Sequence, residues 1–191
     1  MMYEAYMNKV IFIDRDGVIN KDLWGYVEKW EQFEFLPGVL ESLKKLTQAG
    51  FSIIIISNQA GIADGLFSLE DLDEVNKNML HEIEQHGARI AGTYYCPHSK
   101  TAECDCRKPK TGLFEQATHS LPEYEKEKTF YIGDKISDIK AGKNFGLKTI
   151  MVMTGYGERE KDLISDETQP DFMAADLPEA VQIVLKQKRS E

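Results

Sequence analysis

The chain has 191 residues, of which 42% are hydrophobic and 29% charged, an ordinary composition for one globular domain with its own core. Its 32 acidic and 23 basic residues give a formal net charge of −9, which argues against general binding to nucleic acid or to anionic membranes. No apolar run approaches the roughly 18 residues of a membrane-spanning helix, and residues 1–10 lack the hydrophobic region of a signal peptide. We therefore expect a single domain (residues 1–191) in a cytoplasmic, monomeric protein that binds neither nucleic acid nor membranes.

Short apolar runs that suit buried strands alternate along the chain with amphipathic stretches that suit helices. Alternation of this kind is typical of an α/β fold with a mainly parallel sheet, in which ligands bind at the carboxyl ends of the strands. In chain order, we expect a strand at 10–13, a helix at 37–50, a strand at 51–56, a helix at 68–83, a strand at 93–96, a helix at 112–119, a strand at 129–132, a helix at 137–145, a strand at 149–153 and a helix at 176–185.

Local signals place the ends of these helices. Pro37 suits the first turn of a helix, and Gly50 suits the position just after its end. Ser68 and Asp71 have the spacing of a capping box, in which each side chain accepts a hydrogen bond from the backbone N–H of the other residue. The residues worth inspecting for chemistry are therefore those that follow each strand.

The first predicted strand runs directly into Asp14, Arg15, Asp16 and Gly17. Because side chains alternate along extended backbone, the two carboxylates point the same way, toward the open edge of the sheet. Two carboxylates in one small site repel each other unless a cation is bound or one of them takes a proton. One can then act as a nucleophile while the other carries a proton, although a solvated turn has the same composition.

Three further motifs follow later strands or lie in the loop between them. Residues 57–59 (Ser-Asn-Gln) could donate hydrogen bonds to a phosphoryl oxygen, or could simply cap a helix. Arg107 and Lys108 form a pair of cations that could bind an anion or lie on the solvated surface. Asp134 and Asp138 offer the hard oxygen ligands that suit Mg²⁺, although Asp138 could also stabilise the N-terminus of its helix.

All three cysteines of the chain lie within the segment 96–106, in the pattern Cys96-x-His98-x5-Cys104-x-Cys106. Three thiolates and one imidazole satisfy the tetrahedral coordination of Zn²⁺ and leave no position open for a substrate, so the pattern indicates a structural zinc site. The alternatives are buried or incidental cysteines, or a redox pair. A closed metal site here would steady the cations of the next two positions along the chain.

Four motifs in this order resemble those of the haloacid dehalogenase superfamily of aspartate-dependent phosphohydrolases, over residues 9–185. The resemblance implies a three-layer, Rossmann-like α/β fold, and the short intervals between motifs leave no room for a large cap domain. It also implies catalytic roles. Asp14 would be the nucleophile, Asp16 the general acid and base, Ser57 a ligand of the transferring phosphoryl group, and Lys108 the cation that neutralises it.

The same resemblance implies a magnesium site formed by Asp14, the backbone carbonyl of Asp16, and Asp134, with Asp138 at the position of the motif's second acid. Within the superfamily, the cysteine pattern followed by Arg-Lys-Pro is similar to the zinc-containing subgroup that acts on heptose bisphosphates and on histidinol phosphate. That similarity implies contacts with a small phosphorylated sugar from Asp22, Gly25, Tyr26, Asn58, Gln59, Arg107 and Lys135.

We therefore expect a Mg²⁺-dependent phosphatase that works through an aspartyl-phosphate and removes the 7-phosphate of D-glycero-D-manno-heptose 1,7-bisphosphate. A histidinol-phosphate phosphatase is the main alternative. A further alternative is a non-catalytic module, either one that accepts phosphate or a binding module stabilised by zinc. Without a large cap, short loops must cover the site, and Trp24, Tyr26 and Trp30 are candidates for this lid, although Trp30 could equally be a packing residue.

Overall fold

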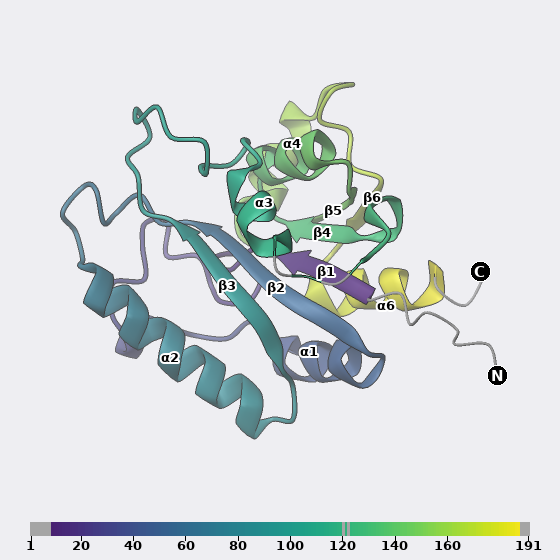
Figure 1. Ribbon diagram of the computed structural model, residues 1–191, viewed down its shortest axis with the longest axis horizontal. Helices are drawn as coiled ribbons and strands as arrows, with labels where there is room; N and C mark the ends of the chain where they lie inside the picture. Colours follow the sequence, from purple (N-terminus) through teal and green to yellow (C-terminus); the bar gives the residue numbers. More distant parts are fainter. Residues whose placement is uncertain (1–8, 120, 122, 188–191) are drawn as a thin grey trace.

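One parallel six-stranded sheet forms the centre of the protein. The computed structural model describes residues 9–119, 121 and 123–187 (Figure 1). The strands run in the spatial order β3-β2-β1-β4-β5-β6, with every neighbouring pair parallel. The strands are β1 (Lys9–Ile13), β2 (Phe51–Asn58), β3 (Ile90–Cys96), β4 (Phe130–Gly133), β5 (Lys148–Val152) and β6 (Phe172–Ala174).

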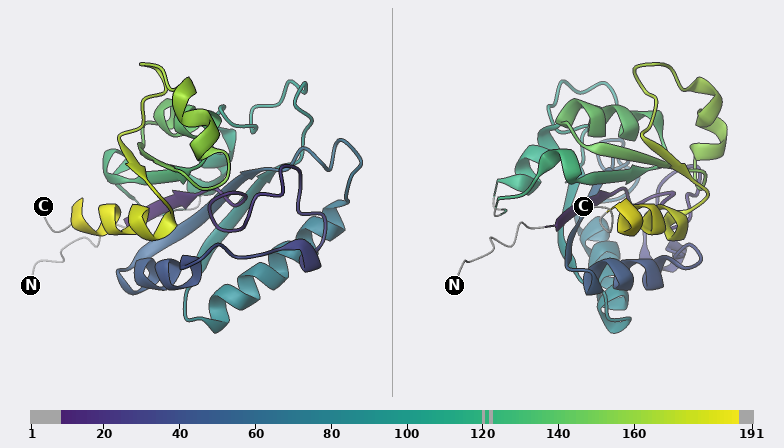
Figure 2. Two further views of the ribbon diagram at one scale, coloured as in Figure 1. Left: turned by 180° about the vertical axis from the view of Figure 1, so that it is seen from behind. Right: turned by 90° about the vertical axis from the view of Figure 1, so that its right-hand side faces the viewer.

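Helices cover both faces of this sheet and make a three-layer structure (Figures 1 and 2). The first face packs against α1 (Val39–Gln48), α2 (Leu69–Gln85) and α6 (Leu177–Gln187). The opposite face packs against α3 (Gly112–Thr118) and α4 (Ile136–Phe145). Shorter elements complete the described chain: α5 (Gly157–Glu160) and the 3-10 turns Trp30–Gln32, Lys126–Lys128 and Lys161–Leu163.

Two hydrophobic cores explain why the strands are apolar along their whole length. In β1, Ile11 and Ile13 face the core beneath α1 and α6, whereas Val10 and Phe12 face the core beneath α3 and α4. On the second side, Phe114 of α3 packs edge-on against Phe12, with ring centroids 5.1 Å apart. A strand buried on both faces needs apolar residues at every position, which is the pattern the sequence shows.

The predicted α/β fold, with a mainly parallel sheet, three layers and no large cap domain, is confirmed for the described residues. The capping box is also confirmed, because Asp71 N donates to Ser68 Oγ (3.1 Å) and Ser68 N donates to Asp71 Oδ2 (2.7 Å). The helix predicted from residue 37 begins only at Val39, since Gly38 has a left-handed backbone (φ 74°). Sequence patterns did not predict β6 and α5, which have three and four residues and are too short for a periodic signal.

In the described part of the chain, none of the helices combines the length and the apolar character needed to cross a bilayer. The expectation about an N-terminal signal falls largely on residues 1–8, outside the described residues.

The strand order places the functional motifs at the carboxyl ends of the two central strands. After β1 the chain builds β2 and β3 on one side, and β4, β5 and β6 then extend the sheet on the other side of β1. The carboxyl ends of β1 and β4 therefore lie side by side at the point where the strand order reverses, which is where open α/β sheets bind ligands. Asp14 continues the ladder there, since its N–H donates to the carbonyl of Ile132 (2.9 Å).

Candidate active site

A fully buried lysine joins two of the predicted site aspartates. Lys108 Nζ lies 2.9 Å from Asp14 Oδ1 and 2.7 Å from Asp138 Oδ1, and each of the three residues is less than 5% exposed. The same ammonium group donates to the hydroxyl of Tyr131 (2.8 Å) and to the carbonyl of Ile56 (3.1 Å). Burial lowers the pKa of Lys108, but the two carboxylates outweigh it and raise the pKa above its ordinary value. The lysine is therefore a fixed positive charge at the end of β1.

Asp14 is held in place from its backbone side. Its Oδ1 accepts a hydrogen bond from the N–H of Arg15 (2.8 Å) in addition to the ion pair with Lys108. Burial raises the pKa of Asp14 to about 6, the nearby Asp138 adds to the increase, and Lys108 opposes it. An ionised Asp14 thus depends on nearby positive charge.

Asp16 has a different environment although it lies only two residues away. Burial pushes its pKa upward, but Arg15 and two amide side chains outweigh burial, and the pKa of Asp16 is lowered. Arg15 is completely buried and makes a forked pair, with Nη2 3.0 Å from both carboxylate oxygens. The amides are those of Asn20, which donates to Oδ1 (3.0 Å), and Gln59, which donates to Oδ2 (2.7 Å). The two carboxylates of the motif are therefore tuned in opposite directions.

Asp134 is the third carboxylate at this point, and one of its oxygens lacks a hydrogen bond. Its Oδ2 accepts from the N–H of Tyr156 (2.8 Å), whereas Oδ1 has no hydrogen-bond donor among the described residues. Lys135 Nζ lies 3.9 Å from Oδ1. Burial, helped by Asp138 and Asp14, raises the pKa of Asp134 well above its ordinary value. Gly17 and Gly155 pack against this carboxylate so closely that a Cβ on either would collide with Oδ2.

These residues fit a divalent cation. Asp14, Asp134 and Asp138 each offer a carboxylate oxygen, and the three oxygens lie within 4.8 Å of one another. Burying three carboxylates together is unfavourable without compensating charge, and the raised pKa values of Asp14 and Asp134 express that cost. Asp138 already contacts Lys108 and Tyr131 through Oδ1 and the N–H of Lys135 through Oδ2, so Asp14 and Asp134 are the carboxylates with more capacity to bind a metal.

A cleft opens from these carboxylates toward solvent. Its inner recess has a volume of about 40 Å³ and its outer pocket about 360 Å³, and the two share four lining residues. The recess brings together the four predicted catalytic residues, Asp14, Asp16, Ser57 and Lys108. The pocket contains six of the predicted substrate contacts, namely Asp22, Gly25, Tyr26, Asn58, Arg107 and Lys135.

The seventh predicted substrate contact, Gln59, lies behind the cleft. It is completely buried, and its amide donates to Asp16 Oδ2 and to Ser57 Oγ (3.0 Å). Asn58 lines the pocket but also pairs with the backbone of Lys108: its Oδ1 accepts from the lysine N–H (3.1 Å), and its Nδ2 donates to the lysine carbonyl (3.3 Å). Both amides thus position charged residues of the site.

Several residues of the site were missed by the sequence analysis. Ser137 and Tyr156 each follow a strand closely, so the strand-end rule that found Asp134 could have found them. Trp24 was considered only as a lid candidate, and nothing in the sequence singles out Lys100, although both line the pocket. The sequence analysis also assigned no role to Arg15, which the structure buries completely against Asp16.

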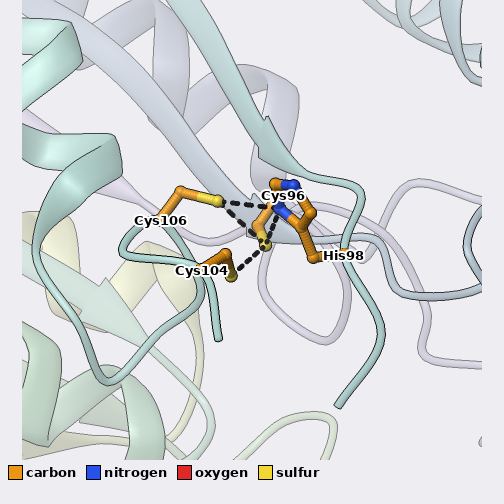
Figure 3. Close-up of side chains that lie close together, drawn as sticks. All are labelled: Cys96, His98, Cys104 and Cys106. Carbon is orange, nitrogen blue, oxygen red and sulfur yellow. Dashed lines mark hydrogen bonds between the residues drawn. The ribbon is translucent and has the colours of Figure 1, made fainter. Parts of the chain in front are cut away.

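The four residues of the cysteine pattern converge on one point at the end of β3 (Figure 3). Cys96 Sγ lies 3.2 Å from Cys106 Sγ, 3.8 Å from Cys104 Sγ and 3.5 Å from His98 Nδ1. Four ligands at tetrahedral angles about 2.3 Å from a shared zinc ion lie about 3.8 Å apart, close to these separations. The cluster therefore fits a tetrahedral metal ion.

Cys106 is protonated at neutral pH unless a cation binds to it. Burial raises the pKa of Cys106 to about 12, and the adjacent thiols Cys96 and Cys104 add to the increase. A metal ligand must be a thiolate, so a bound cation would have to displace the proton of Cys106. Cys106 directly precedes Arg107 and Lys108, which links the geometry of the cluster to the cations of the cleft.

Comparison with known proteins places this site in context. A family model described as HAD-hydrolase-like matches residues 105–180. The D-glycero-beta-D-manno-heptose-1,7-bisphosphate 7-phosphatase of Haemophilus influenzae is 36% identical over 172 residues, covering 84% of this chain and 92% of that protein. The D-glycero-D-manno-heptose-1,7-bisphosphate 7-phosphatase of Chlorobaculum tepidum is 37% identical over 184 residues, covering 91% and 92%.

A solved structure agrees with these relatives. The D,D-heptose 1,7-bisphosphate phosphatase from B. bronchiseptica, complexed with magnesium and phosphate, superposes with a TM-score of 0.86 at 28% identity. The match covers 94% of this chain and 99% of that one. The likeness therefore extends over nearly the whole fold.

The raised pKa of Asp14 predicts how stability depends on pH in protein dialysed free of Mg²⁺. Between the ordinary value of 3.8 and about 6, the folded chain keeps a proton that the unfolded chain has released. The folded state then binds more protons, so Asp14 lowers the free energy of unfolding as pH rises through this range. Urea unfolding should show the stability difference shifting in favour of Asp14→Asn, by on the order of 2 kcal/mol, between pH 4 and 6.

Asp73→Asn is the control, since Asp73 is exposed on α2. The difference in free energy of unfolding between this variant and the wild type should not show the same shift between pH 4 and 6. If the difference in free energy of unfolding between Asp14→Asn and the wild type is independent of pH, or shifts in favour of the wild type as pH rises, the burial of an ionisable Asp14 is contradicted.

Proposed function

The chain is a phosphatase of the haloacid dehalogenase-like hydrolases, in the family of D-glycero-D-manno-heptose-1,7-bisphosphate 7-phosphatases, and we propose that it removes the 7-phosphate of this sugar bisphosphate through Asp14. The observation that carries the proposal is the buried contact between Lys108 and Asp14 at the bottom of a cleft that Asp16 also lines. It combines a nucleophile, a cation and a proton carrier within one recess.

In the first step, a carboxylate oxygen of Asp14 attacks phosphorus, the bond from phosphorus to the sugar oxygen breaks, and Asp16 gives that oxygen a proton. The described contacts of Asp14 fall on Oδ1, so Oδ2 would be the attacking oxygen. In the second step, water attacks the aspartyl-phosphate and gives a proton to Asp16. Inorganic phosphate leaves, and both carboxyl groups return to their starting states.

Asp16 must carry a proton for the first step, although its pairing with Arg15 favours the ionised form. Its side chain is 17% exposed and lines the cleft, so a bound phosphate dianion would lie close to it. Negative charge nearby raises the pKa of a carboxyl group, so substrate binding would favour protonation of Asp16. Asn20 and Gln59 would hold the acid while its charge changes.

The negative charge of the phosphoryl group is offset by groups on two sides of the recess. Lys108 supplies a fixed cation, and Ser57 can donate its hydroxyl proton because its oxygen accepts from Gln59. Asp14, Asp134 and the backbone carbonyl of Asp16 would hold Mg²⁺ beside it. When bound, Mg²⁺ would reduce the repulsion between the attacking carboxylate and the phosphate dianion. Asp138 would serve by positioning Lys108.

The outer pocket supports a substrate that extends beyond one phosphate. Arg107 and Lys135 both line it, and the planar guanidinium of Arg107 suits a second phosphate or a row of hydroxyl groups. The pocket volume of about 360 Å³ is enough for a phosphorylated sugar.

For the cysteine cluster, the ligand set of Cys96, His98, Cys104 and Cys106 supports a structural Zn²⁺ ion. All four positions are filled by protein ligands, so the ion would have no place for substrate. Its role would be to close the loop that continues into Arg107 and Lys108. The two hydrogen bonds between the side chain of Asn58 and the backbone of Lys108 hold the other side of the same loop.

Release of inorganic phosphate tests the proposed activity. With Mg²⁺ present, kcat/KM should be at least about 100-fold higher for D-glycero-D-manno-heptose 1,7-bisphosphate than for histidinol phosphate. Phosphorus NMR should show that the product keeps its anomeric phosphate. Asp14→Asn should lower kcat by at least about 10³-fold while its circular dichroism spectrum stays that of the wild type. Comparable kcat/KM on both compounds would overturn the substrate, and an active Asp14→Asn would overturn the nucleophile.

Metal analysis tests the zinc site. Wild-type protein should hold about one equivalent of Zn²⁺, and Cys106→Ser should lose most of it and unfold at a lower temperature. Because the loop also places Lys108, kcat/KM should fall roughly ten- to hundredfold. Asp105→Asn is the matched control, since this side chain lies between two of the cysteines and is 99% exposed. Retention of full zinc by Cys106→Ser, or loss of zinc in Asp105→Asn, would count against this ligand set.

A further inference from the structure

Trp24 has a strained backbone at the mouth of the cleft. Among the described residues other than glycine, Trp24 is the one with a left-handed backbone, with φ at 60°. Bulky side chains rarely adopt this conformation, and it persists where the surrounding structure fixes it. Here the N–H of Trp24 donates to Asp22 Oδ1 (2.6 Å), while Asp22 Oδ2 lies 3.3 Å from Lys135 Nζ. The strained residue is thereby tied to a lysine that lines both parts of the cleft.

The indole ring is fixed by residues from a distant part of the sequence. The guanidinium carbon of Arg159 lies 3.6 Å from the centroid of the ring, a close cation–π contact. Tyr156 packs edge-on against the same ring, with centroids 5.0 Å apart, and its own ring lies 4.3 Å from Lys135 Nζ. These contacts join the loop after β1 to the segment that begins α5.

Despite these contacts, Trp24 is 51% exposed, and both Trp24 and Tyr156 line the outer pocket. The second tryptophan of the chain shows the contrast: Trp30 stacks on Phe33, with centroids 5.1 Å apart, and packs against the main hydrophobic core. Trp30 is therefore a packing residue. Trp24 combines strain, rigid support and exposure, which a packing role does not explain.

We propose that Trp24 is a specificity-determining residue whose indole, held by Tyr156 and Arg159, forms a wall for the carbon skeleton of an extended phosphomonoester. The inference rests on the proposed phosphatase activity and names what selects its substrate. Aromatic rings present a large, rigid apolar face at low cost in conformational entropy, so they suit the carbon–hydrogen face of a sugar or another extended skeleton. A phosphomonoester too short to leave the inner recess does not reach the wall.

The test compares extended and short substrates. Phosphate release would be measured with heptose 1,7-bisphosphate, with histidinol phosphate and with ethyl phosphate, and the preference defined as kcat/KM for the better extended substrate divided by that for ethyl phosphate. Trp24→Ala should lower this preference at least about tenfold, mainly by raising KM for the extended substrate, with less than a threefold loss on ethyl phosphate. Trp24→Phe should restore part of the preference, because it returns an aromatic face.

Leu23→Ala is the matched control, because Leu23 is the exposed neighbour in the same loop and does not line the pocket; its preference should equal that of the wild type. An unchanged preference in Trp24→Ala, or an equal loss on all three substrates, would overturn the wall. If the wild type instead prefers histidinol phosphate, the proposed heptose substrate fails, while the same comparison still decides the role of Trp24.

Discussion

The ion pairs of Lys108 with Asp14 and Asp138 are the interactions on which the rest of the site depends. Three carboxylates meet at the carboxyl ends of β1 and β4, in a region almost without access to water. Such a group of like charges is stable only with positive charge beside it. The lysine supplies part of that charge permanently, and the oxygen of Asp134 that has no hydrogen bond in the described chain indicates where a cation would supply the remainder.

Much of the architecture around this point serves to hold the lysine. It comes from the loop between β3 and α3, nearly a hundred residues after Asp14, so local structure alone does not place it. The side chain of Asn58 pairs with its backbone on one side, and the cysteine cluster precedes it on the other. Above it the cleft widens toward Trp24 and Tyr156, so the same sheet edge carries both the chemistry and the surface that selects a substrate.

The sequence predicted those parts of the site that depend on strand ends. Asp14 and Asp134 each follow an apolar run, and parallel strands bring such positions to one edge whatever their spacing in sequence. It could not predict that Gln59 would turn inward to Asp16, or that Arg159 would support Trp24, because those contacts join segments whose approach is decided only by tertiary packing. The sequence missed β6 for a different reason, because three residues at the edge of the sheet are too few to give a periodic pattern.

The account rests on covalent chemistry at Asp14, and a crystal structure of the protein with Mg²⁺ and beryllium fluoride addresses it directly. Beryllium fluoride imitates a phosphoryl group bonded to a carboxylate. The account predicts density for it joined to Asp14 Oδ2, with Lys108 against its fluorine atoms and the metal between Asp14 and Asp134. Beryllium fluoride bound elsewhere in the cleft, with Asp14 free of it, would contradict the central claim.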